Sequence, residues 1–239
     1  MSHEIKLHTA QTSILRELLF APQAGFAELQ KPTGLESDHF VFHINRLMEI
    51  GFVEKIGRGQ YRLTMIGKEY ANRLDTDERT IERQAKISVL IVPMRPRDGD
   101  SSKIEYLMQR RLKQPFYGRM GFMSGKIRWG ETIVEGARRE LSEETGLKAD
   151  LALKCIYHKL DYTVSGTLLE DKHFYILAAT NPRGNLKAKF DSGSNHWHTL
   201  AEINDLTNKF PGVQEVIDRI HQPDLSLWEE SYHHQQEDY

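Results

Sequence analysis

The hydrophobic pattern of this chain changes once, near Lys86, and that change limits the folds available to it. Before this point, apolar residues recur at helical spacing, as in the segment Thr12–Phe20. After it, Ile87–Met94 is a run rich in β-branched residues, which favours a buried strand. The two patterns predict a helical part followed by a part that contains a β-sheet.

The chain has 239 residues, which is long for one core and suits two smaller domains. The residues around position 80 are polar, as in a linker, and the end of the chain is also polar, which indicates a loosely held tail. We therefore expect a first domain at residues 1–76, a linker at 77–85, a second domain at 86–222 and a C-terminal tail at 223–239.

Within the first part, the pattern predicts three helices, a two-stranded hairpin and a fourth helix. Ser37 suits the cap of the third helix, and Gly51 ends it. This order resembles the winged helix-turn-helix domains of bacterial and archaeal regulators, and the stretches His43–Lys55 and Tyr61–Lys68 carry the likeness. The helices are expected at 12–20, 26–30, 37–51 and 64–74, and the strands at 52–56 and 60–63.

The resemblance implies that this small, mostly α-helical domain contacts double-stranded DNA through its third helix and hairpin. Residues 1–75 hold nine Lys and Arg against nine Asp and Glu, whereas DNA-binding domains usually present a basic face. DNA binding and a role in homodimer formation or protein contact therefore both stay open. The candidate DNA contacts are His39, His43, Arg46, Arg58 and Arg62.

The second part predicts strands and helices in alternation. Its central element is a helix from Glu131 to Thr145, closed by Gly146. Thr199 begins a helical stretch, and a last helix is expected at 211–220. The strands are expected at 87–94, 104–112, 120–127 (broken by glycines), 151–160, 173–179 and 185–191.

The helix that ends at Gly146 carries Glu140, Glu143 and Glu144 three and four residues apart, which places them on neighbouring surface. Like charges at these spacings cost about 0.2–0.5 kcal/mol a pair, and anions in the last turn cost about 0.3–1 kcal/mol each. When a helix keeps several side chains that destabilise it, those side chains are expected to serve a function. Clustered carboxylates without Cys or His suit a hard cation, Mg²⁺ or Mn²⁺.

The run Gly125–Leu147 reads Gly, five residues, Glu, seven residues, Arg-Glu-Leu, one residue, Glu-Glu, one residue, Gly-Leu. This string resembles the signature of the NUDIX hydrolases at each of its defining positions. The resemblance covers about residues 85–222 and implies an α/β fold, the NUDIX α/β/α sandwich with a mixed sheet. It also implies a phosphoanhydride hydrolase that acts on a small nucleotide derivative.

The resemblance assigns roles within this run. Glu140, Glu143 and Glu144 match the residues that bind or position Mg²⁺, and one of them activates water. Ser124, before the first glycine, offers its carbonyl to the metal. Glu131 and Arg139 hold the loop and helix together by charge, and Gly125 and Gly146 are structural positions of the motif.

Other substrate-binding residues are predicted from charge and position. Arg110, Arg111 and Lys113 precede the motif, and Lys126 and Arg128 lie in its loop. Tyr162 lies about where some relatives place an aromatic ring against the nucleobase. Many relatives also have a second catalytic glutamate in a loop before a late Trp, but here the stretch from Asp191 to Trp197 contains no glutamate. Asp191 becomes the candidate second base, and the alternative is that Glu140 is the base alone.

Composition narrows the function classes further. The formal net charge is −2, so nothing global favours nucleic acid or anionic membranes. The single cysteine, Cys155, cannot form an internal disulfide. No apolar run reaches the ~20 residues that span a bilayer, and we expect a cytoplasmic protein without membrane contact.

Two functions therefore compete. The complete motif favours a NUDIX-type enzyme. The preceding winged-helix-like segment favours a transcriptional regulator in which the second domain senses a nucleotide derivative.

Overall fold

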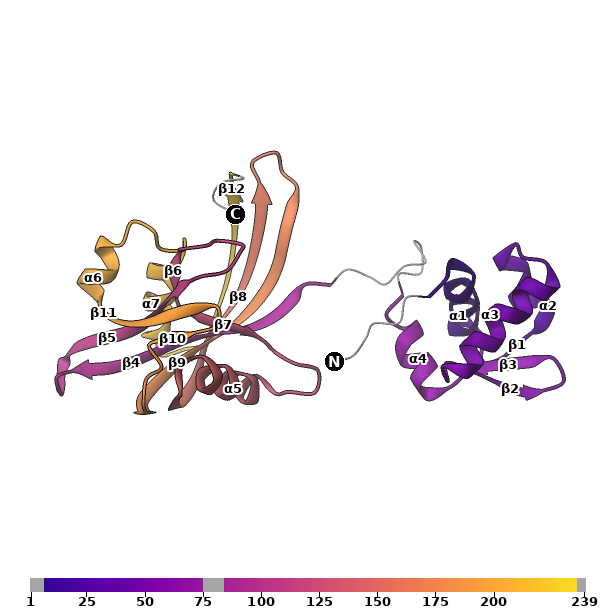
Figure 1. Ribbon diagram of the computed structural model, residues 1–239, viewed down its shortest axis with the longest axis horizontal. Helices are drawn as coiled ribbons and strands as arrows, with labels where there is room; N and C mark the ends of the chain where they lie inside the picture. Colours follow the sequence, from indigo (N-terminus) through magenta and orange to yellow (C-terminus); the bar gives the residue numbers. More distant parts are fainter. Residues whose placement is uncertain (1–6, 75–83, 236–239) are drawn as a thin grey trace. The chain divides into compact units, whose positions relative to one another are not determined.

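A computed structural model describes residues 7–74 and 84–235 of the chain (Figure 1). The chain divides into two compact units, residues 1–83 and 84–239. Most of the expected linker, 77–85, falls on residues 75–83, which lie outside the described residues.

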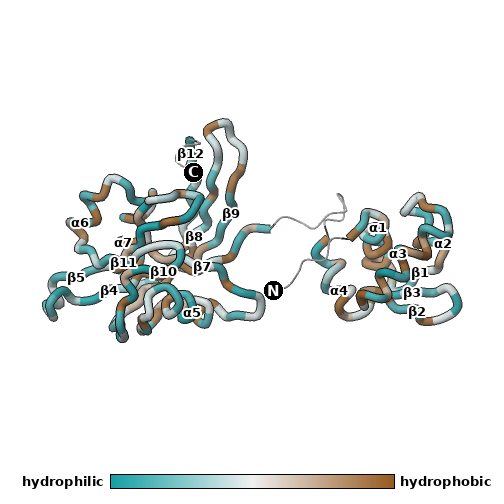
Figure 2. Tube along the Cα trace, viewed as in Figure 1, coloured by the Kyte–Doolittle hydropathy of each residue, from teal (hydrophilic) through white to brown (hydrophobic). Residues whose placement is uncertain are grey.

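The first unit has a helical core closed by a small sheet. Hydrophobic stretches recur along its helices and are separated by hydrophilic ones (Figure 2). Phe40, Ile44 and Leu47 form the buried stripe of the third helix, at the spacing of one helix face. The elements are α1 (Thr9–Phe20), β1 (Ala24–Gly25), α2 (Phe26–Gln30), the 3₁₀-helix η1 (Lys31–Thr33), α3 (Ser37–Glu49), β2 (Val53–Gly57), β3 (Gln60–Leu63) and α4 (Met65–Ala71).

The helices and the hairpin follow the expected order, with two differences. Glu36, not Ser37, is the residue before α3, and Ser37 is the first helical residue. The short strand β1 was not expected. It pairs with β3 and extends the β2–β3 hairpin to a three-stranded sheet. A strand of two residues is too short to be recognised from hydrophobic periodicity. The assignment of this unit to the winged-helix class stays a prediction.

The second unit is built on a mixed sheet. Its main path runs β10-β11-β5-β4-β9-β8-β12, with β6 beside β5 and β7 beside β4. The β4–β9 and β8–β12 pairs are parallel, and the other pairs are antiparallel. The strands are β4 (Lys86–Arg97), β5 (Asp100–Arg111), β6 (Met120–Gly121), β7 (Met123–Lys126), β8 (Leu147–Thr163), β9 (Leu168–Gly184), β10 (Lys189–Phe190), β11 (Gly193–Thr199) and β12 (Ser226–His234).

Three helices belong to this unit: α5 (Ile133–Thr145), α6 (Leu200–Asp205) and α7 (Val213–Ile220). The expected helix 131–145 begins two residues later than predicted, because Thr132 caps it. The expected strand 185–191 is reduced to Lys189–Phe190. Among the described residues, no helix is long and apolar enough to cross a membrane.

Strand alternation divides the core of this unit into two layers. Ile176 and Ala178 of β9 pack with the buried face of α7, whereas Leu177 and Ala179 pack on the other side with Ala137 and Leu141 of α5. Val134 of the same helix is exposed. Helices therefore cover both faces of a mixed sheet, which confirms the expected α/β/α sandwich.

The prediction of a loosely held tail is wrong for residues 226–234. They form β12, which pairs in parallel with β8 along its whole length and lies beside the projecting β8–β9 hairpin (Figure 1). Trp228 is buried and stacks on Tyr157, with ring centroids 3.8 Å apart and 8° between the planes. The polar composition suggested a tail because one face of this edge strand is exposed, and only alternate residues reach the core.

We expect Trp228→Ala to destabilise the second unit by about 3–5 kcal/mol, the usual cost of removing a buried large aromatic side chain. Urea unfolding followed by far-ultraviolet circular dichroism measures this change. The neighbouring Leu227 is 66% exposed, so Leu227→Ala serves as the control and should change stability by less than about 0.5 kcal/mol. Equal effects of the two substitutions would contradict the packing of β12.

Candidate active site

The helix α5 has well-defined ends, which fix the position of its carboxylates. Thr132 accepts a hydrogen bond from the Glu135 backbone N–H, and the Glu135 carboxylate accepts one from the Thr132 N–H at 2.9 Å. This reciprocal pair is a capping box. The helix ends at Gly146, whose φ of 72° is in the left-handed region that favours glycine. Glu140 and Glu144 therefore lie one turn apart on a helix whose first and last residues are fixed by its caps.

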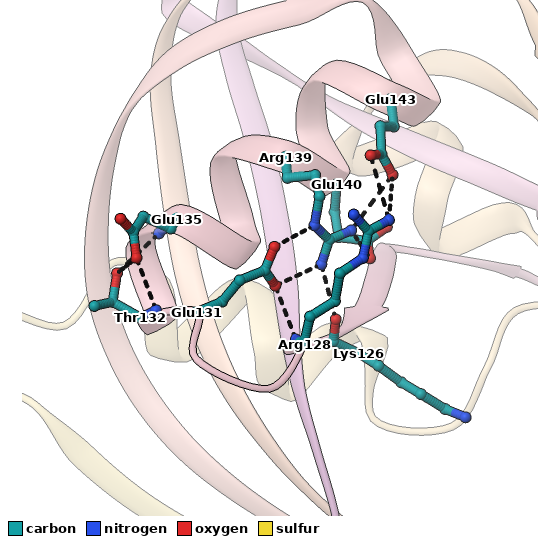
Figure 3. Close-up of polar contacts among 8 residues, drawn as sticks. All are labelled: Lys126, Arg128, Glu131, Thr132, Glu135, Arg139, Glu140 and Glu143. Atoms are coloured by element: carbon teal, nitrogen blue, oxygen red, sulfur yellow. Dashed lines mark hydrogen bonds and ion pairs between the residues drawn. The ribbon is translucent and has the colours of Figure 1, made fainter. Parts of the chain in front are cut away.

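The Arg139 guanidinium connects this helix to the loop that precedes it (Figure 3). Its Nε and Nη2 donate to the two oxygens of Glu131 at 2.5 and 2.8 Å, and Nη2 also donates to the Lys126 carbonyl at 3.0 Å. The Arg128 N–H donates to Glu131 at 2.8 Å. The hydrogen bond from Arg139, followed by the one from Arg128, lowers the pKa of Glu131 to about 2, and Glu131 in turn raises the pKa of Arg139.

Glu140 lies directly against the backbone of β7. A Cβ atom built on Gly125 would be 1.9 Å from the Glu140 Cδ atom, so only glycine leaves room for this carboxylate. The Arg139 Nη1 atom donates to Glu140 Oε1 at 2.5 Å. One glycine and one arginine thus determine where the Glu140 side chain lies.

Glu144 is held by two polar side chains that the sequence did not single out. Gln109 of β5 donates to Glu144 Oε2 at 2.9 Å, and the buried Asn195 of β11 donates to the Glu144 carbonyl at 2.9 Å. Gln109 also donates to Asn195 Oδ1 at 3.1 Å. Burial raises the pKa of Glu144, and the charge of Glu140 adds to this, while Gln109 opposes it.

Glu140 and Glu144 line a cleft of about 540 Å³ within the second unit. Ser124 and Gly125 line it beside them. Cationic side chains contribute from several strands and loops, and aromatic rings complete the walls. The cations are Lys86, Arg111, Lys113, Lys126, Lys159 and Lys172, and the aromatic residues are Phe116, Phe122, Tyr157, Phe174 and Phe210.

Glu143 faces away from this cleft. It is exposed, lies 3.4 Å from both Arg128 and Arg139 (Figure 3), and lines an adjoining groove of about 500 Å³ together with Glu140, Glu144 and Asp191. The three glutamates therefore share one groove, and two of them also reach the cleft.

Family comparison identifies the fold that carries this arrangement. The family model of the NUDIX domain matches residues 85–220, more than half of the chain. The chain belongs to the NUDIX family.

Solved structures agree with this assignment at the level of the fold. The second unit resembles the NUDIX domain of Shewanella oneidensis NrtR complexed with ADP ribose, at 18% identity and a TM-score of 0.51 over 66% of this chain and 96% of that one. It also resembles a MutT protein from Bacillus halodurans, at 19% identity and a TM-score of 0.51 over 64% of this chain and 93% of that one.

A curated relative matches a shorter stretch. The oxidized purine nucleoside triphosphate hydrolase of Mus musculus is 40% identical over 58 residues, which are 24% of this chain. This chain spans 36% of the length of that relative.

Three residues expected at the substrate, Arg110, Arg128 and Tyr162, do not line the cleft of the NUDIX domain. Arg128 instead lies 3.4 Å from Glu143. Arg110 is exposed and alternates with Gln109 and Arg111, so its side chain leaves the opposite face of β5. Tyr162 stacks on His233, at 5.4 Å between ring centroids, and faces away from the cleft for the same reason. These three positions therefore differ from the prediction, whereas Arg111, Lys113 and Lys126 do line the cleft.

The residues of the motif fit a hard divalent cation. The donors that Glu140, Glu143, Glu144 and Ser124 offer are all oxygen atoms, which Mg²⁺ and Mn²⁺ prefer. Burial chiefly raises the pKa of Glu144 and the charge of Glu140 adds to it, so a cation held by these carboxylates would offset both effects.

We expect Glu131→Gln to lower the melting temperature of the NUDIX domain at pH 7, because it removes the charged partner of Arg139. The pKa of Glu131 is about 2 in the folded protein against 4.5 ordinarily. Its stabilising contribution is therefore complete above pH 4.5 and lost as the pH falls toward 2. Differential scanning calorimetry of both proteins should show melting temperatures that converge over this range; a constant difference would contradict the ion pair.

Proposed function

We propose that this protein is a magnesium- or manganese-dependent hydrolase that cleaves a phosphoanhydride bond in a nucleoside diphosphate linked to another moiety. The observation that carries the proposal is the lining of the cleft. Glu140 and Glu144 stand in the same cavity as six cationic side chains, five aromatic rings and a third carboxylate, Glu170, which pairs with Lys86 and Lys172. A diphosphate with an attached base needs all three kinds of group.

The chain itself binds and orients the substrate. Arg111, Lys113 and Lys126 lie in the same cleft as the carboxylates and would bind the phosphate oxygens. Among the aromatic residues that line the cleft, Phe210 is only half-buried and would offer apolar surface to a nucleobase. Charge at one part of the cleft and aromatic surface at another would orient the phosphoanhydride toward Glu140 and Glu144.

The cation would be held by Glu140, Glu143 and Glu144, with Ser124 beside them. When bound, it neutralises phosphate charge and lowers the pKa of a coordinated water toward 7. Arg139 holds one oxygen of Glu140 and Gln109 holds one oxygen of Glu144. Either carboxylate can then accept the proton of the attacking water while the P–O bond of the anhydride breaks and the leaving phosphate takes the electron pair.

The comparisons support a nucleotide derivative as the substrate class. One structural neighbour holds ADP ribose, and the curated relative is named for hydrolysis of oxidized purine nucleoside triphosphates.

Asp191 lines the groove that contains Glu140 and Glu144 and remains the proposed second base.

We expect Glu140→Gln and Glu144→Gln each to lower kcat by about 10²–10⁴-fold, the usual contribution of a general base. Turnover of nucleotide sugars, ADP-ribose, dinucleoside polyphosphates and oxidised nucleotides with Mg²⁺ measures this. Glu135→Gln is the matched control, because Glu135 lies on the same helix and only caps it. Absence of turnover with the whole panel would overturn the proposed hydrolase.

A second function is proposed for the first unit, namely binding of double-stranded DNA. The supporting observation is that α3 and the β2–β3 hairpin expose His39, Arg46, Arg58 and Arg62. Two of these are already in ion pairs: Arg46 with Glu49 at 2.9 Å, and Arg62 with Glu54 at 2.6 Å.

His43 is a weaker DNA contact than the sequence suggests. It is half-buried and stacks on His8, with 4.5 Å between the ring centroids, and burial followed by the charge of His8 lowers its pKa. A contact to DNA would therefore rest mainly on the exposed arginines.

Selection on random duplex DNA tests this second function, and a recovered sequence preference would support it. Arg58→Ala should then weaken binding and make the slope of log K against log salt concentration shallower by about one, as expected when one phosphate is no longer neutralised. Lys148→Ala, an exposed cation of the second unit, is the control and should leave the affinity unchanged. Absence of DNA binding at low salt would leave dimerisation or protein contact as the role of this unit.

A further inference from the structure

A second group of metal-ligating side chains lies on the sheet face that points away from the cleft. Lys159 and Lys172 are directly opposite each other on β8 and β9, and both line the cleft. Their neighbours His158 and His173 are also directly opposite each other and, because side chains alternate along a strand, leave the other face. Glu229 of β12 is the partner of His158 on the next strand.

The donor atoms of this group are close together. His158 Nε2 is 3.0 Å from Asp171 Oδ1, and the His158 and His173 rings are stacked, 4.2 Å between centroids and 9° between planes. One ligand atom from each of His158, Asp171 and His173 lies within 4.8 Å of the others, and no other set of three among the described residues does so. All three side chains are half-buried.

Glu229 gives the group the organisation of a metal site. Its Oε1 atom is 3.0 Å from His158 Nδ1. A carboxylate that accepts a hydrogen bond from one ring nitrogen fixes the tautomer and directs the other nitrogen to a metal. Here the directed nitrogen is Nε2, the atom next to Asp171. Ion pairing would explain why His158 lies between the two carboxylates. It would not explain why the His173 ring is stacked on the His158 ring.

We propose that His158, His173 and Asp171 form a binding site for a transition-metal cation of the zinc class, with Glu229 as a positioning residue. Two imidazole nitrogens and one carboxylate oxygen suit Zn²⁺, whereas Mg²⁺ prefers oxygen atoms alone. Ligands of a tetrahedral Zn²⁺ ion lie about 3.3 Å apart, given bonds of about 2.0–2.1 Å. The side chains therefore tilt inward on binding, and water completes the coordination.

The site would cross-link β8 and β9 and, through Glu229, engage β12. These strands form the projecting hairpin and its neighbour (Figure 1). The site is chemically distinct from the all-oxygen donors of the motif, and the proposal does not depend on hydrolase activity.

The experiment is a Zn²⁺ titration of the full-length protein by isothermal calorimetry. The Glu140→Gln/Glu144→Gln background removes competition from the carboxylates of the motif. One equivalent of Zn²⁺ should bind. In the same background, Glu229→Gln should weaken binding by about 10–100-fold, the usual effect of losing a carboxylate behind a metal-bound histidine. His173→Ala should weaken it by more than that.

The control is His233→Ala, since His233 is on β12 but contacts Tyr162 and lies outside the group. It should leave the Zn²⁺ affinity unchanged. Absence of saturable binding, or an affinity unchanged by His173→Ala, would overturn the site. Imidazole ¹⁵N NMR of the unsubstituted protein gives a readout that does not require a variant to fold: Zn²⁺ should shift the resonances of His158 and His173, and unshifted resonances would overturn the site as well.

Discussion

The candidate active site depends on one guanidinium. Arg139 binds both oxygens of Glu131, the carbonyl of Lys126 and one oxygen of Glu140. Its side chain is 15% exposed, so these bonds are partly shielded from water. Without them, the loop before α5 would have no fixed path, and Glu140 would lose the group that offsets its charge. The loop, the helix and the first carboxylate are therefore positioned together.

The sheet contributes a second constraint, the alternation of side chains along β8 and β9. Lys159 and Lys172 line the cleft, while their immediate neighbours His158 and His173 leave the opposite face. Alternation also separates Arg111, which lines the cleft, from Arg110, which does not. A shift of register by one residue would exchange the two faces and remove the cations from the cleft.

Features that depend on local sequence were predictable, and features that depend on long-range pairing were not. The helix that carries Glu140 and Glu144 could be predicted from its periodicity, its terminal glycine and its fixed spacing. Gln109 and Asn195 could not, because a neutral polar residue on a strand has no local signature, and their role arises only where β5 and β11 pair. Lys159 could be placed at the cleft only after the pairing of β8 with β9 was known.

The segment β12 shows most clearly how a local interpretation fails, and it also connects the end of the chain to the cleft. Asp161 is fully buried and pairs with Lys159, which lines the cleft. His234, at the end of β12, lies 2.7 Å from the same carboxylate. Burial lowers the pKa of Lys159, and the charge and hydrogen bond of Asp161 chiefly oppose this effect. A buried carboxylate that loses a partner is costly, so the position and charge of a cleft lysine depend on a strand more than 60 residues farther along the chain. Residues that by composition alone would be set aside as a tail therefore help to hold the buried carboxylate that pairs with a lysine of the cleft.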